Sequence, residues 1–270
     1  MRSNDNIKER IQRLSEFKSG FFSLKEDEPQ KINIKSNELF ENETRNNMVK
    51  WLVFLSETLN FSNQTLFLSI TIFDKYISVS DLLENEELNQ EKMNLITIGC
   101  LSLATKLEEI NCNYVKFFTD KVLNLPDCQI FSIKDLTQME MTILKKLKFK
   151  TLYSTAYDFL LFYLELAEYF YNLPKYFIAN IKNYSLNLMK QNINSNLYLS
   201  MYQSDYAFFC LQQAFVQIGQ KFIMVKIRNI LISDDLLRMQ RKRNFNDNNE
   251  INERNFNRNL EVNHFSLSSF

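Results

Sequence analysis

The chain of 270 residues contains only three glycines and three prolines. Sheets depend on hairpins and tight turns, which usually need glycine because it adopts backbone conformations that other residues avoid. A chain this poor in turn residues is therefore expected to be all-α, with helices joined by polar turns. Apolar residues make up 45% of the sequence, and the length allows one large domain or two of about 100 residues each.

Charge and cysteine usage exclude several classes of protein. The 32 basic residues balance the 32 acidic ones, whereas a dedicated nucleic-acid binder is usually strongly basic. The cysteines lack the close pairing of a zinc site and predict buried free thiols in a reducing compartment. The four are Cys100, Cys112, Cys128 and Cys210.

The start MRSNDNIKER is polar, which predicts no signal peptide. No apolar run approaches the roughly 20 residues that a membrane span needs. We expect a soluble protein of the nucleus, the cytoplasm or both, with no membrane, nucleic-acid or small-molecule partner, no metal and no cofactor.

The pattern of apolar residues divides the chain into four segments. Residues 1–44 are predicted to form a polar tail with a short helix around 7–17, and the Asn- and Arg-rich residues 231–270 are predicted to be disordered. Residues 45–150 carry strong helical periodicity, and 151–230 carry a second, weaker set. In the first set we expect helices at about 45–60, 63–78, 91–110, 113–120 and 132–147.

The stretch LITIGCLSLATKL in the third of these helices is apolar nearly all round, as in a helix enclosed by others. Gly99 and Ala104 are small and should let the neighbouring helices approach closely. Ser62 and the pair Ser132 and Asp135 are expected to cap the helices that follow them. The predicted architecture is a central helix wrapped by four others, followed by a divergent second bundle without an obvious central helix.

Stripes in the second set predict three helices. One stripe includes Leu160 and Leu164, and another begins after Pro174. Their core positions are predicted to be Leu160, Leu164 and Ala167; Phe177, Ile181, Tyr184 and Leu188; and Phe208, Leu211, Phe215, Ile218 and Phe222.

Four charged residues lie on apolar stripes of the first set, namely Arg45, Asp74, Lys106 and Glu140. A charge removed from water costs several kcal/mol unless it is paired. We expect Arg45 and Asp74 to form an ion pair between two helices. For Lys106 and Glu140, the spacing alone leaves open whether the partner lies within the chain or on another protein.

The same positions resemble the cyclin family over about 45–165. The family's signature residues are an Arg before a Trp-Leu pair, an Asp, a Leu, a Lys before two Glu, and a Glu after Met. They correspond to Arg45 in TRNNMVKWL, Asp74 in IFDKYIS, Leu95, Lys106 in LATKLEEI, and Glu140 in QMEMTILKKLKF. Five positions in order over ~100 residues make a specific pattern.

The resemblance implies tandem five-helix cyclin folds, the second divergent, in a regulatory subunit that binds and activates a cyclin-dependent protein serine/threonine kinase. It assigns Lys106 and Glu140 to kinase contact, and Arg45 with Asp74 to a structural pair. Leu107 and Glu109 are predicted to join the kinase contact. Trp51, Leu95, Gly99 and Ala104 are predicted to belong to the core of the cyclin box.

Some features depart from the family pattern. The first helix carries polar Thr44 and Asn47, with Lys50 and Phe54 where acidic residues are common, which predicts no strong docking of substrates there. The weak second half leaves open a degenerate scaffold or adaptor that binds a partner without activating it. A DNA-binding cyclin fold is disfavoured by the balanced charge and the absence of paired cysteines before the box. An enzyme is not expected, since the single histidine, His264, lies in the C-terminal tail and no phosphate-binding loop is present.

Overall fold

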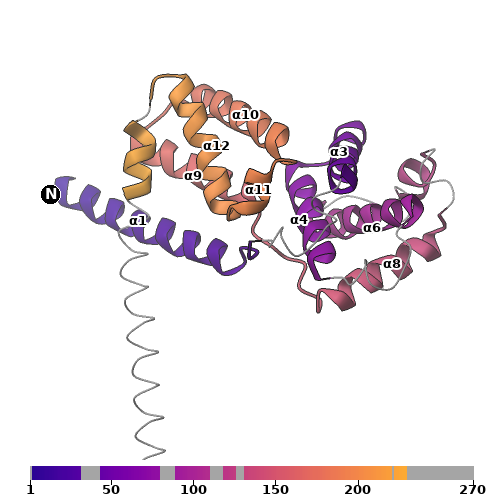
Figure 1. Cartoon of the computed structure of the whole chain (residues 1–270). Helices are drawn as coiled ribbons and strands as arrows, with labels where there is room; N and C mark the ends of the chain where they lie inside the picture. The colour runs from indigo at the N-terminus through magenta and orange to yellow at the C-terminus, as the bar shows by residue number, and fades with distance from the viewer. Residues whose placement is uncertain are drawn as a thin grey trace, which may run out of the picture. The chain divides into compact units, whose positions relative to one another are not determined.

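The regular structure is entirely helical in the computed structural model, which describes residues 2–31, 43–79, 89–109, 118–125, 131–220 and 222–229 (Figure 1). The prediction of an all-α fold is therefore confirmed. Met1–Gln220 form one compact unit, and the residues from Lys221 onward form a second, of which a helix over 222–229 is described. The tail predicted at 231–270 lies outside the described residues.

The first half of the larger unit contains four long helices close to their predicted positions. A short π-helical turn, η2, covers Phe118–Val122. Of the helix expected at 113–120, residues 113–117 lie outside the described part, and the last three belong to this turn. The four helices are α3 (Glu43–Thr58), α4 (Asn63–Val79), α6 (Gln90–Glu108) and α8 (Ile133–Lys146).

Helix α6 is the centre of this half, where it packs against α3, α4 and α8 (Figure 1). Its residues from Ile96 to Thr105 are all buried. Gly99 faces α8: a Cβ atom there would lie 3.0 Å from both Met139 Cγ and Ile143 Cδ1. Since real side chains rarely approach so closely, glycine allows the two helix axes to come together at this point.

The sequence also predicts the starts of these helices. The Ser62 hydroxyl accepts a hydrogen bond from Thr65 N at the start of α4, at 3.1 Å. Ser132 and Asp135 form a reciprocal capping box at the start of α8. Both predicted caps are present, because a short polar side chain just before an apolar stripe satisfies N–H groups that the helix itself cannot pair.

The second half consists of helices that match the three predicted stripes, with one short addition. Pro174 precedes α10, as expected. The predicted core differs at Tyr184, Ile218 and Phe222, which are exposed. In α10 the buried residues are Ile181, Ser185 and Met189. The last two each lie one residue after a predicted core position, Tyr184 and Leu188. The helices are α9 (Ala156–Tyr171), α10 (Lys175–Asn192), α11 (Asn196–Ser200) and α12 (Gln203–Gln217).

The N-terminal segment differs from the expected tail with a short helix over 7–17, because helix α1 covers Arg2–Glu26. Phe17 and Phe21 are buried against α9, with their ring centroids 6.1 and 5.7 Å from that of Phe162. Aromatic pairs of this kind stabilise the contact beyond the area that they bury. The sequence of the segment alone gives no sign of this partner, which lies far along the chain.

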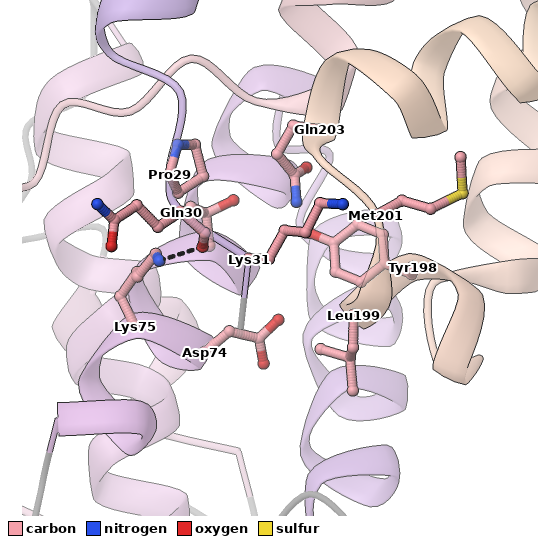
Figure 2. A pocket seen from close by; sticks show the side chains of 10 residues that line it. Pro29, Gln30, Lys31, Asp74, Lys75, Tyr198, Leu199, Met201 and Gln203 are labelled. Atoms are coloured by element: carbon pink, nitrogen blue, oxygen red, sulfur yellow. Dashed lines mark hydrogen bonds between the residues drawn. The ribbon is translucent and has the colours of Figure 1, made fainter. Parts of the chain in front are cut away.

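Residues 27–31 lead from α1 toward the first half and contact several elements on the way. Glu28 Oε1 accepts a hydrogen bond from Ser204 N at 2.6 Å, at the start of α12. Lys75 Nζ on α4 donates to the carbonyl oxygen of Gln30 at 2.5 Å (Figure 2). A small pocket of mixed polar and apolar lining lies between this segment, α4 and α11, and none of its lining residues is one of the four predicted to bind a kinase.

Candidate functional site

Lys106 and Glu140 meet between the last turns of α6 and the middle of α8. The Lys106 ammonium nitrogen lies 2.6 Å from Glu140 Oε2 and 2.7 Å from Oε1. The lysine side chain is 38% exposed and the glutamate side chain 7%. The two residues are thus brought together at the surface, with the carboxylate below and the ammonium facing outward.

A third polar residue, Ser102, belongs to the same cluster. Its hydroxyl donates a hydrogen bond to Glu140 Oε1, and the serine is completely buried. Ser102 lies one helical turn before Lys106, so both side chains face α8. The sequence analysis did not select it, although a serine at this spacing on an otherwise apolar helix is a detectable signal.

Large apolar side chains are exposed next to the cluster along the chain. Leu107, predicted to be a contact residue, is 42% exposed, and Met141 is 44% exposed. Beyond the end of α8, Phe149 is 64% exposed and Leu152 63%. The sequence analysis missed the last three, since periodicity identifies buried faces and cannot tell which other apolar residues remain uncovered.

Phe149 has an unusual backbone for a bulky residue, with φ at +60°, and Lys148 before it has φ at +52°. Its N–H donates to the carbonyl oxygen of Leu144 at 2.7 Å, which closes the end of α8. A left-handed conformation is unfavourable for residues with a Cβ atom and occurs where the surroundings require it. The chain thus holds an aromatic ring outward at a site where glycine would be expected.

Glu109 uses its carboxylate within the chain. Its Oε1 atom accepts hydrogen bonds from Ser62 N at 2.8 Å and from the Thr65 hydroxyl at 2.6 Å. Partial burial opposes its ionisation, but these hydrogen bonds outweigh the burial and lower its pKa. Glu109 therefore links the end of α6 to the start of α4 through hydrogen bonds. Its contact with a kinase stays a prediction.

Arg45 and Asp74 form the ion pair expected between the first two helices. Arg45 Nε and Nη2 lie 2.8 Å from Asp74 Oδ1 and Oδ2. Burial disfavours the charged guanidinium, but the neighbouring carboxylate outweighs it and raises the pKa of Arg45. The guanidinium also donates to the carbonyl oxygen of Ile193, at 3.4 Å from each terminal nitrogen, so the pair reaches the second half.

The remaining predicted box residues divide between the interior and the surface layer. Gly99 and Ala104 are buried, whereas Trp51 and Leu95 are half-buried. Phe54, one turn of α3 after Trp51, is 57% exposed.

No group of histidine, cysteine or acidic side chains suited to a metal ion occurs in the described parts of the chain. Among the helices that the structure describes, none has the length and apolar character to cross a bilayer.

The central helix with its three long neighbours and the Lys–Glu pair at its exposed end define a cyclin-type bundle. Residues 21–152 match the family described as "Cyclin, N-terminal domain". A viral cyclin from herpesvirus saimiri has a similar fold, with a TM-score of 0.51 and 15% identity over 70% of this chain and 81% of that one. This likeness covers more of the chain than 21–152, so it extends beyond the first half. The chain belongs to the cyclin family.

Three plant cyclins illustrate the level of sequence similarity. Cyclin-A1-4 of Oryza sativa subsp. japonica is 28% identical over 137 residues, which is 51% of this chain and 35% of the relative. Cyclin-B2-1 of Arabidopsis thaliana is 29% identical over 45% of this chain and 26% of the relative. The G2/mitotic-specific cyclin C13-1 of Daucus carota is 33% identical over 42% and 30%. The matching part thus spans about a third or less of each relative.

Proposed function

We propose that this chain binds and activates a cyclin-dependent protein serine/threonine kinase, with no catalytic activity of its own. The observation that carries the proposal is the Lys106–Glu140 pair at the exposed edge of the first half. Glu140 is nearly buried and orients the lysine, whose more exposed ammonium can donate hydrogen bonds to carbonyl oxygens of a partner. The family membership supports a protein partner of this kind, acting in the nucleus or cytoplasm.

Apolar contacts would surround this polar centre. Leu107 and Met141 adjoin the pair in sequence, and Phe149 is exposed beyond the end of α8. An interface gains most of its binding free energy from such side chains when they enter pockets of the partner at the centre of the contact. We therefore assign these three residues to the kinase interface together with Lys106 and Glu140.

Activation would follow from a shift in the conformational equilibrium of the kinase. A protein kinase is active only when the glutamate of its regulatory helix pairs with the lysine that orients ATP. A partner that binds the inward position of this helix more tightly than the outward position increases the active population by the ratio of the two affinities. The rigid α6–α8 pair offers a preformed surface for the inward position.

The test is affinity purification of the full chain from cells, with identification of the bound kinase and an activity assay. Lys106→Ala with Glu140→Ala should remove the kinase and leave the fold intact. A matched control removes another surface ion pair, Lys190 with Glu57, whose atoms are 3.1 Å apart. Wild-type recovery of kinase by the first double variant would refute the proposal.

The same assay addresses the scaffold alternative. The second half departs from its predicted core at Tyr184, Ile218 and Phe222, so a chain that binds a partner without activating it is the second candidate. The scaffold is supported, and activation contradicted, if the wild-type chain captures a kinase without raising its activity. Capture should in that case still require Lys106.

A further inference from the structure

Ser102 hydrogen-bonds a carboxylate outside its own helix, as Thr65 does with Glu109, whereas several other buried hydroxyl residues bond their own helix backbone. Thr97 and Thr105 on α6 each donate to a carbonyl oxygen one turn earlier in α6, at 2.7 and 2.8 Å. Ser69 on α4 does the same with Leu66, at 2.8 Å. Ser102 instead donates across the helix interface to Glu140 Oε1.

This choice has an energetic basis. A buried hydroxyl without a hydrogen bond is unfavourable, and the helix backbone could also supply Ser102 with an acceptor. A hydrogen bond to a charged group is stronger than one to a neutral carbonyl oxygen. Ser102 therefore donates to the Glu140 carboxylate rather than to a backbone carbonyl. This hydrogen bond fixes one carboxylate oxygen of Glu140.

The geometry gives this contact a role in orienting the pair. Glu140 Oε1 accepts hydrogen bonds from both the Ser102 hydroxyl and Lys106 Nζ, and Oε2 also accepts one from Lys106 Nζ. With one oxygen fixed from the buried side, rotation of the carboxylate about its last bond is restricted. The direction in which it holds the lysine ammonium is then fixed as well.

We propose that Ser102 is a positioning residue for the kinase-binding lysine, acting through Glu140; this inference rests on the proposed function. Ser102 makes no contact with the kinase, since it is completely buried. It presents Lys106 in one orientation before the partner arrives, so the interface does not have to order this side chain on binding.

The test compares Ser102→Ala with Ser69→Ala, which removes a hydroxyl equally buried in the neighbouring helix. Both variants should keep the helix, and Ser102→Ala should lose more stability in urea unfolding, because it alone removes a hydrogen bond to a charged group. Kinase affinity should fall severalfold, up to about tenfold, for Ser102→Ala, as expected when a long side chain must be ordered on binding, and stay at the wild-type value for Ser69→Ala.

A second readout needs no kinase. In the free protein, the ¹⁵N-labelled Lys106 ammonium should give a slowly exchanging NMR signal that is lost in Ser102→Ala and kept in Ser69→Ala. Unchanged affinity and an unchanged signal in Ser102→Ala would overturn the positioning role. A change in only one of the two, affinity or NMR signal, would also overturn the positioning role, since the proposal requires both to change.

Lys106→Ala separates this failure from failure of the proposed function. If Lys106→Ala still binds the kinase like the wild type, the proposed function is wrong, and the positioning role falls with it. If Lys106→Ala abolishes binding while Ser102→Ala binds normally, only the positioning role is wrong.

Discussion

Arg45 and Asp74 face each other with two parallel nitrogen–oxygen contacts of 2.8 Å, and their side chains are only 1% and 3% exposed. The Arg45 guanidinium also lies 5.8 Å from the centre of the Tyr198 ring in α11. A buried charge pair contributes little net stability when complete, but either charge alone is strongly unfavourable. The pair therefore specifies how α3 and α4 meet.

Replacing one member of this pair should be far more harmful than replacing both. We expect Arg45→Ala to lower the free energy of unfolding by about 3–5 kcal/mol, because Asp74 is left buried and unpaired. Arg45→Met combined with Asp74→Leu should lose much less. Urea unfolding of the three proteins measures both values, and equal losses in the single and double variants would contradict this account.

Glu28 provides a cap for α12 from a distant part of the sequence. That helix has no side-chain cap of its own, and the Glu28 side chain is 4% exposed, between Ser204 N and Lys25. Glu28→Ala should cost about 1–2 kcal/mol, as the loss of a helix cap does. It should also speed hydrogen exchange of the Ser204 amide. Glu26→Ala, at an exposed neighbouring position, is the control, and unchanged exchange at Ser204 would disprove the capping role.

Glu109 should make part of the stability depend on pH. Its pKa in the folded chain is lowered below the ordinary 4.5, so its contribution is fully present above that value and is lost as the pH falls through the folded pKa. Glu109→Gln should be about 1 kcal/mol less stable than the wild type at pH 7. This difference should shrink in urea unfolding series below pH 4.5, whereas a constant difference would show that the carboxylate charge is irrelevant.

Substitution of Phe149 should weaken kinase binding without lowering the stability of the fold. Phe149→Gly removes a mostly exposed ring and relieves a left-handed backbone, so the free energy of unfolding should stay unchanged or rise by up to about 1 kcal/mol. Kinase affinity should fall at least tenfold if the ring enters a pocket of the partner. Tyr176→Ala, which removes a 72% exposed ring from α10, is the control for affinity. A variant that is destabilised but binds normally would place Phe149 in the fold rather than the interface.

The sequence predicts the first half well because its signals are local. Helix periodicity, the caps at Ser62 and Ser132, and the place of Arg45 and of Asp74 on the apolar stripe of its own helix all follow from residues within one or two turns. The enclosed character of α6 is likewise visible in its own composition. Such features need no knowledge of distant segments.

The features that the sequence analysis missed depend on contacts between distant segments. Phe17 and Phe21 become buried only through α9, so they resemble tail residues when read alone. The buried face of α10 includes Ser185 and leaves Tyr184 exposed, because its neighbours decide which face is covered. The link from Ser102 to Glu140 spans two helices, and a serine alone does not reveal which partner it selects.

The aromatic contact between α1 and α9 affects how the chain emerges during synthesis. Helix α1 leaves the ribosome well before α9 has been made, so Phe17 and Phe21 remain in water in the meantime. At typical elongation rates this delay lasts on the order of ten seconds. A chaperone that recognises short aromatic segments has that interval in which to bind the nascent N-terminus, and it must release it before the N-terminal helix can dock.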